Sequence, residues 1–217
     1  MDNPKPASFT RHRSPGRPTR KQAEARNNQL LDTALDLFLQ QGFERTTIEA
    51  ITAAVGMAKR TVYARYGDKE TLFRTALQRA IDEWIVPIDR LREAESDDFE
   101  ASLLAIGRIL VANILSREGM RLMRITNAES IRMPEIGEHA LRQGTGPTVA
   151  YLADMFQRRL PERFSNPVEA ADVAYSYLQL VAGGPANIVA WGVSLTDEQV
   201  ERQTRTNVRL FLHGVLH

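Results

Sequence analysis

Apolar side chains in this chain recur at intervals of three and four residues, the spacing that places them on one side of an α-helix. Leu30, Ala34, Leu37 and Phe38 begin the series. No segment alternates apolar and polar residues over four to eight positions, and no Asn-Gly pair marks a hairpin turn. The sequence therefore predicts an all-α protein.

Glycines, prolines and cap residues divide the chain into separate helices. We expect a helix from residue 27 to Gly42, a short helix after Thr46 and Thr47, a second short helix at about 58–64, and further helices at about 68–93, 99–116, 118–131, 134–160, 167–191 and 196–215. Pro87 is expected to kink the helix at 68–93. The glycine-proline clusters at 144–147 and 183–185 are expected to break or bend theirs.

Charge is distributed unevenly along the chain. Residues 1–75 carry 13 lysines and arginines against 8 acidic residues, whereas residues 76–217 are net acidic. A basic N-terminal part indicates a polyanionic partner for that part, although a chance fluctuation gives the same pattern. We predict a disordered basic arm at 1–25, a DNA-binding domain at 26–75 and a larger domain at 76–217. Arginine-rich arms can enter the minor groove of DNA, and Arg17, Arg20 and Lys21 are the candidates here, a solvated tail being the alternative.

The composition excludes several kinds of chemistry. The chain has no cysteine, and its histidines include no pair at metal-binding spacing. It also lacks a phosphate-binding glycine loop, a serine-nucleophile motif and a dinucleotide-binding motif. We therefore predict no metal, no cofactor and no enzymatic activity.

Neither a secretory leader nor a membrane span is predicted. The first twenty-five residues hold no apolar run. The least polar long stretch, Leu178 to Val193, is interrupted by Gln179, Pro185 and Asn187. A cytoplasmic, nucleoid-associated protein without membrane partners is the expectation.

The segment from Thr46 to Tyr66 has the proportions of a helix-turn-helix, with Gly56 in the turn. The start of the second helix of such a unit meets base edges, and basic side chains further along meet phosphates. The predicted DNA-binding residues are Thr46, Thr47, Lys59, Arg60, Thr61, Tyr63, Arg65, Tyr66 and Lys69. The alternative is a helical hairpin with a solvated basic face.

A longer pattern surrounds this unit. It runs Leu31-x-x-Ala34-x-x-Leu37-Phe38-x-x-x-Gly42-Phe43-x-x-Thr46-Thr47, continues with Ile51 through Gly56, and ends Lys59-x-Thr61-Val62-Tyr63-x-x-Tyr66-x-x-Lys69-Glu70-x-Leu72-Phe73. This pattern resembles the N-terminal domain of the TetR family of bacterial transcriptional regulators. A shorter stretch, Asn127 to Ile136, resembles a turn in the AefR/AcrR-like C-terminal domains of that family.

Four positions depart from the family pattern. Thr52 stands for the usual alanine, Ala58 for serine or threonine, Arg60 for a frequent glycine and Arg65 for a frequent histidine. Ala58 leaves the following helix without a side-chain cap. The departures concern which DNA sequence is read rather than whether DNA is bound.

The resemblance implies a larger C-terminal domain that binds a small molecule and dimerises through its last two helices. Bulky apolar and adaptable side chains are the candidates for a largely apolar effector pocket, namely Trp84, Leu103, Ile106, Leu110, Met123, Tyr151, Met155, Tyr175 and Gln179. The stripes predicted to form a homodimer interface contain Leu178, Ala182, Ala186, Val208, Phe211 and Leu212. Plain core packing is the alternative for both sets.

These expectations define one function and two rivals. The favoured function is a ligand-responsive repressor that binds an inverted-repeat DNA operator as a homodimer and is released by a small-molecule effector. An effector-independent architectural DNA-binding protein is the first alternative, and an all-helical enzyme is the second.

Overall fold

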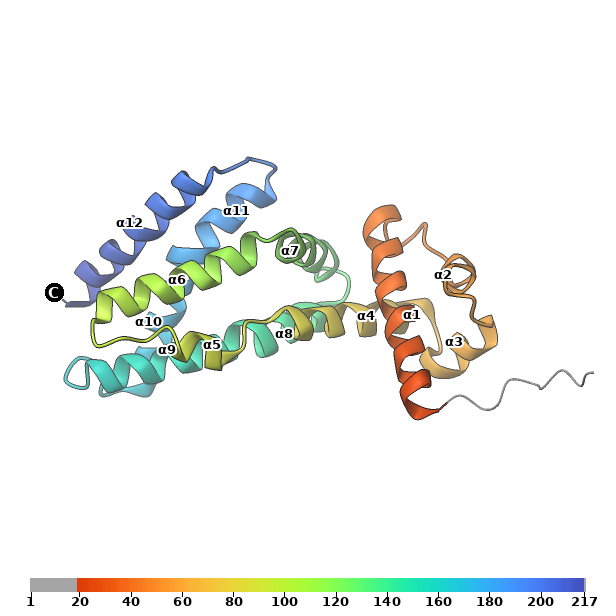
Figure 1. The fold of residues 1–217 in the computed structure, drawn as a ribbon, viewed down its shortest axis with the longest axis horizontal. Helices are drawn as coiled ribbons and strands as arrows, with labels where there is room; N and C mark the ends of the chain where they lie inside the picture. The colour runs from red at the N-terminus through yellow and green to blue at the C-terminus, as the bar shows by residue number, and fades with distance from the viewer. Residues whose placement is uncertain (1–18, 217) are drawn as a thin grey trace, which may run out of the picture.

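The computed structural model describes residues 19–216, and every regular element in that part of the chain is helical, as the periodicity predicts. Figure 1 shows a small head, which contains α1, α2 and α3, at one end of a larger helical body, with α4 leading from one to the other. The elements are α1 (Arg20–Gln41), α2 (Ile48–Val55), α3 (Lys59–Tyr66), α4 (Lys69–Trp84), α5 (Ile88–Arg92), α6 (Phe99–Leu115), α7 (Arg117–Glu129), α8 (Pro134–His139), η1 (Ala140–Thr145), α9 (Gly146–Arg159), α10 (Pro167–Leu178), η2 (Gln179–Gly183), α11 (Gly184–Ala190) and α12 (Asp197–Leu216).

The first helix begins earlier than the apolar periodicity predicts. Thr19 accepts a hydrogen bond from the backbone N–H of Gln22, and the side chain of Gln22 accepts one from the backbone N–H of Thr19. This reciprocal capping box starts α1 at Arg20, so the prediction of a disordered arm through residue 25 was wrong for residues 20–25. Arg20 and Lys21 lie in the first turn of α1. Arg17 lies outside the described residues.

The head and the body share α4, which crosses the predicted domain boundary at residue 75 without interruption. Leu72, Phe73 and Leu77 of α4 are completely buried in the core of the head. The same core includes Leu122 of α7 and Ile136 of α8. The head is therefore packed directly against the body and is not joined to it by a linker.

Pro87 ends the helix that it was expected only to kink. The backbone leaves the helix at Ile85 (ψ 135°), and Pro87 (ψ 135°) precedes the new helix α5. Proline has no N–H to donate, and its ring disfavours the helical conformation at the residue before it. The break places Ile85 and Val86 in the wall of a cavity described below.

The two glycine-proline clusters do not break their helices. At each one the chain continues as a short π-helical segment, η1 between α8 and α9 and η2 between α10 and α11. Through these wider π-helical turns, α8 continues into α9 and α10 continues into α11 without a break. Within residues 19–216 no single helix is both long and apolar enough to cross a membrane, and α6 with α7 pass that test only as a pair bent by 68°.

The core of the body is built around Phe156. Its ring contacts the rings of Phe99, Phe164, Tyr177 and Phe211. Tyr177 is completely buried, and its hydroxyl donates a hydrogen bond to the carbonyl of Leu103. Helices α6, α9, α10 and α12 are thereby held together.

Candidate nucleic-acid interface and ligand pocket

Helix α3 is attached to the head by one side only. Val62 and Tyr66 are buried, while Lys59, Arg60, Thr61, Tyr63, Ala64 and Arg65 are exposed. Gly56, with φ of +62°, makes the turn from α2 to α3 in a left-handed conformation that favours glycine. The exposed side of α3 has a shallow depression lined by Ala58, Arg60, Thr61, Ala64 and Arg65. In this depression the long cationic side chains of Arg60 and Arg65 lie beside small side chains.

Cap residues fix the ends of these short helices. Thr47 accepts a hydrogen bond from the N–H of Ala50 and begins α2. Asp68 accepts one from the N–H of Thr71 (2.7 Å) and begins α4, and this bond lowers the pKa of the Asp68 carboxyl. Helix α3 has no side-chain cap at Ala58, as the sequence predicts.

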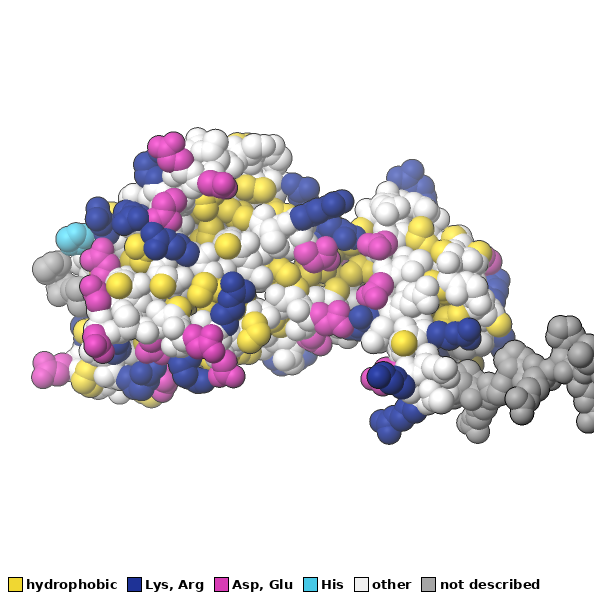
Figure 2. All heavy atoms as spheres, in the orientation of Figure 1, with side chains coloured by type: hydrophobic (Ala, Val, Ile, Leu, Met, Phe, Trp, Pro, Cys, Tyr) yellow, Lys and Arg dark blue, Asp and Glu magenta, His cyan; other side chains and the backbone are white. Residues whose placement is uncertain are grey.

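The cations of the head differ from those of the body in their partners. Most arginines of the body are ion-paired, as Arg163 is with Glu169, and Arg108 and Arg205 hydrogen-bond to Glu201 and lower its pKa to about 2. Figure 2 shows basic and acidic side chains interspersed over the body. Within residues 19–216, no carboxylate lies within ion-pair distance of these head cations: Arg20, Lys21, Arg26, Arg60 and Arg65.

Lys59 is the exception on α3. Its ammonium pairs with Glu49 of α2 and lies 5.8 Å from the centroid of the Tyr63 ring. The pair joins the exposed sides of α2 and α3 and orients Lys59 along the surface.

Three residues predicted to contact DNA make hydrogen bonds within the head. Thr46 is completely buried, and its hydroxyl donates to the carbonyls of Leu37 and Gly42. Tyr66 is 9% exposed and donates to Asn27. The ammonium of Lys69 donates to the carbonyls of Phe43 (2.9 Å) and Glu44 (3.3 Å). Burial contradicts the predictions for Thr46 and Tyr66, because sequence spacing does not show which polar side chains bond to α1 and to the turn that follows it. Lys69 is partly exposed, so its contact with DNA stays a prediction.

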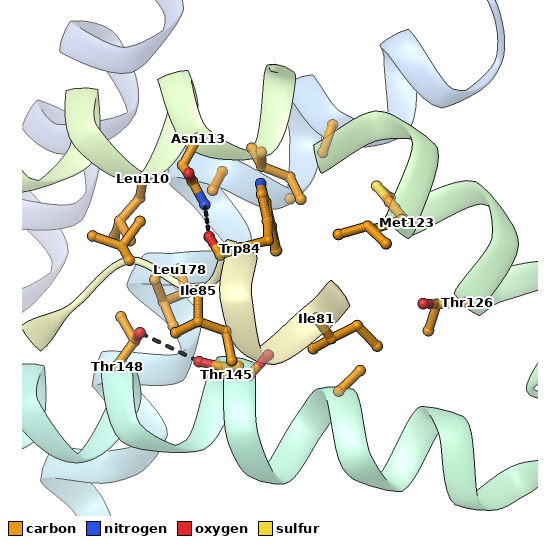
Figure 3. A pocket seen from close by; sticks show the side chains of 18 of the residues that line it. Ile81, Trp84, Ile85, Leu110, Asn113, Met123, Thr126, Thr145, Thr148 and Leu178 are labelled. Carbon is orange, nitrogen blue, oxygen red and sulfur yellow. Dashed lines mark hydrogen bonds between the residues drawn. The ribbon is translucent and has the colours of Figure 1, made fainter. Parts of the chain in front are cut away.

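A cavity of about 410 Å³ lies in the body next to the head. Figure 3 shows Ile81, Trp84 and Ile85, at the end of α4, near the middle of the view, with Leu110 and Asn113 from α6 and Met123 and Thr126 from α7 around them. The remaining walls come from η1, α9, α10, η2 and α11. No lining residue is Asp, Glu, Lys, Arg or His. The cavity is therefore neutral and mainly apolar, with amide and hydroxyl groups as its polar features.

Four of the predicted pocket residues line this cavity, namely Trp84, Leu110, Met123 and Gln179. The other predictions were wrong. Leu103, Ile106 and Met155 are buried in the hydrophobic core of the body. Tyr151 is buried in the same core and donates a hydrogen bond to Glu95, whereas Tyr175 is exposed. Ile81, Ile85, Asn113 and Thr148 were missed. The break at Pro87 and the glycines at 183–184 were the signals that could have located them.

The predicted dimer stripes also face inward. Val208, Phe211 and Leu212 are buried in the core of the body, Leu178 and Ala182 are partly buried in the wall of the cavity, and Ala186 is buried there. The four buried residues of this set are not available to a partner, and the predicted interface does not form one exposed surface. Large apolar side chains on the outer sides of the same helices are exposed instead: Val168 (68%), Tyr175 (44%), Leu180 (37%) and Leu210 (59%).

Comparison with known proteins identifies both parts of the chain. Residues 30–76 match the profile of the bacterial regulatory proteins of the tetR family. Residues 101–214, more than half of the chain, match the C-terminal domain of AefR-like transcriptional repressors.

Individual relatives match less than half of the chain. The regulator TcmR of Streptomyces glaucescens is 34% identical over 105 residues, which are 48% of this chain and 46% of TcmR. The repressor ComR of Escherichia coli K12 is 36% identical over 73 residues, 34% of this chain and 35% of ComR. The alignments thus span less than half the length of either relative.

Solved structures match nearly the whole fold. A TetR-family regulator from Mesorhizobium loti superposes with a TM-score of 0.75 at 23% identity, over 91% of this chain and 98% of that one. The flavonoid-responsive regulator FrrA superposes with a TM-score of 0.66 at 24% identity, over 88% and 97%. With the two profile matches, these findings show that the chain belongs to the TetR family of bacterial transcriptional regulators, a non-enzymatic family of DNA-binding proteins, and carries an AefR-like C-terminal domain.

Proposed function

We propose that the protein is a ligand-responsive repressor that binds an inverted-repeat operator as a homodimer in the cytoplasm and is released by a neutral small molecule. The observation that carries the proposal is the path of α4. Its first turns lie in the core of the head through Leu72 and Phe73, and its last turn lines the cavity through Ile81 and Trp84. A ligand that displaces the end of α4 also displaces the element that follows the recognition helix.

The DNA contacts follow from exposure and charge. Arg60 and Thr61 near the start of α3 are the candidates for reading bases, because arginine pairs with guanine and the methyl group of threonine contacts thymine. Lys59, Tyr63 and Arg65, with Thr47 at the start of α2, are exposed and are proposed to contact phosphates. Arg20 and Lys21, in the first turn of α1, are candidates for the adjacent backbone or minor groove.

A second copy of the chain is the partner that the outer side of α10, η2 and α12 fits best. An exposed apolar patch of this kind marks an association surface. The side-chain amide of Asn207 donates to the carbonyl of Leu180 (2.7 Å), so Leu180 lies beside α12 about one turn before Leu210. Two-fold pairing of this surface leaves both heads free and spaces two recognition helices for half-sites about 34–36 Å apart.

The effector is proposed to be neutral and mostly apolar. A charged ligand would lose its hydration without gaining an ionic partner, because the cavity wall has no ionisable residue. The cavity volume of about 410 Å³ suits a small molecule. FrrA is described as flavonoid-responsive, which makes neutral phenolic compounds the first class to test. The open cavity favours this function over an architectural role without an effector.

Selection of bound duplexes from random DNA, repeated with a mixture of neutral phenolic compounds, tests the proposal. We expect an inverted repeat to be enriched in the first selection and its recovery to fall in the second, since allosteric coupling of 1–3 kcal/mol lowers affinity about 5- to 150-fold. Binding without sequence preference would support the architectural alternative and overturn the proposed repressor. Enrichment of an inverted repeat that no compound releases would overturn the effector.

The dimer is tested by Leu210→Arg. We expect the mass from sedimentation velocity to fall from that of two chains to that of one, because a buried cation without a partner opposes association. Leu141→Arg is the matched control, because Leu141 is a similarly exposed leucine (56%) on η1, away from α10 and α12. A Leu210→Arg protein that remains dimeric would exclude the proposed surface.

A further inference from the structure

The polar groups of the cavity wall fall into two kinds: some are hydrogen-bonded within the protein, and others, such as the buried Nε1 of Trp84 and the carboxamides of Asn127, Gln179 and Asn187, have no hydrogen-bond partner among residues 19–216. The side-chain amide of Asn113 donates to the carbonyl of Trp84 (3.3 Å), and the hydroxyl of Thr148 donates to the carbonyl of Gly144 (3.4 Å). The carboxamide of Gln179, by contrast, makes no hydrogen bond with any other residue in the part of the chain that the structure describes. It can therefore both donate to and accept from a ligand without losing a protein partner.

The backbone around Gln179 is unusual. Gln179 is the first residue of η2, one of two π-helical segments, and both segments line the cavity. Single π-helical turns inside α-helices occur frequently at functional sites. The π-helical turn η2 joins α10 to α11 at the point where this continuous helix lines the cavity.

Because Gly183 has no side chain, the side chain of Gln179 has room to lie against it. A Cβ added to Gly183 would lie 2.8 Å from Oε1 and 3.7 Å from Cδ of Gln179. The carboxamide thus lies over the bare Cα of Gly183, one turn along its own helix. Any larger residue at position 183 would push the carboxamide away from this position.

We propose that Gln179, held over Gly183 in the η2 segment, determines effector specificity by hydrogen-bonding a hydroxyl or carbonyl group of a neutral ligand. The proposal rests on the ligand-binding function proposed above and names the group that selects among ligands. A ligand that lacks the matching group is rejected, because it leaves the carboxamide of Gln179 desolvated and unpaired at a cost.

Matched pairs of probes test this role: flavone with 7-hydroxyflavone, biphenyl with 4-hydroxybiphenyl, and naphthalene with 2-naphthol. Binding is followed by quenching of Trp84 fluorescence. The chain has two tryptophans, and Trp191 is 79% exposed, so Trp191→Phe leaves Trp84 as the reporter in the cavity wall. We expect the parent to bind at least one hydroxylated probe about tenfold more tightly than its unsubstituted partner.

Three variants test whether Gln179 is the residue that causes the preference for the hydroxylated probe. Gln179→Leu is expected to reduce that preference to within about twofold while binding of the unsubstituted probe is kept, and Gly183→Ala is expected to reduce it as well. Asn187→Leu is the control, because Asn187 is another exposed amide of the cavity wall, and it is expected to keep the preference. Thermal unfolding of each variant establishes that it is folded.

The outcomes distinguish this proposal from the broader one. Probes that bind with a preference unchanged in Gln179→Leu, or abolished only in Asn187→Leu, would overturn the role of Gln179 and leave the ligand-binding function intact. If no pair binds the parent, the neutral ligand cavity and the role of Gln179 both fail.

Discussion

Gly119→Ala is expected to lower the free energy of unfolding by about 3 kcal/mol or more and to leave little folded protein on expression. A Cβ at this position would lie 2.5 Å from the carbonyl oxygens of Asn113 and Ile114 and 2.8 Å from Cζ2 of Trp84. Two of these atoms are backbone and cannot move aside without breaking the end of α6. Urea or thermal unfolding of purified protein measures the effect.

The cause is the sharp corner between α6 and α7. Ser116 ends α6 and accepts a hydrogen bond from the N–H of Gly119 (3.0 Å), which brings the first turn of α7 against the last turn of α6. Gly214→Ala is the matched control: no atom of the described part of the chain lies within 4 Å of its added Cβ, and alanine in an exposed helix is expected to add about 0.5–1 kcal/mol of stability. Equal stability of the two variants would show that the corner is more open than described.

Arg60→Ala is expected to weaken binding to the selected operator about 10- to 100-fold and to relax the preference at one base pair of each half-site. Arg60 is exposed on α3 and has no hydrogen-bond or ion-pair partner among residues 19–216. Its removal should therefore leave the melting temperature unchanged. Fluorescence anisotropy against the operator and its single-base variants measures both effects.

Arg65→Ala provides the contrasting result. Arg65, in the last turn of α3, is expected to contact phosphate, so its loss should weaken all sequences alike and make the dependence on salt shallower. Arg90→Ala on α5 is the control, because Arg90 is equally exposed and free of ion pairs within the described chain but lies on the body. An Arg60→Ala protein with unchanged base preference would exclude this side chain from base recognition.

Contacts between head and body bear on how a ligand would act. The guanidinium of Arg132, in the turn between α7 and α8, lies 4.0 Å from the centroid of the Phe43 ring, and Arg121 of α7 pairs with Asp36 of α1 (2.7 Å). Exposed ion pairs contribute about 0–1 kcal/mol each, so the shared apolar core that includes Leu122 is the stronger connection. Because α4 and α7 line the cavity and also pack in the head, we expect the head to move with the cavity wall.

Local features of the chain were predictable because their causes lie within a few residues. The turn at Gly56, a threonine cap at the start of α2, the uncapped start of α3 and the basic exposed side of that helix all follow from neighbouring residue types, although the choice of Thr47 over Thr46 as the cap does not. The start of α1 was missed although Thr19 and Gln22 form its signal, because the arm was judged by its lack of apolar residues.

Most helices, their turns and the family could be predicted from the amino-acid sequence, because periodicity, caps and residue pattern are local properties. Tertiary structure decided which apolar stripe faces which neighbour. Val208 and Phe211 carry the pattern of an interface, yet they are core, while Leu210 between them is exposed. Burial depends on helices distant in sequence, so the same spacing describes a core, a cavity wall or a partner surface, and only packing distinguishes them.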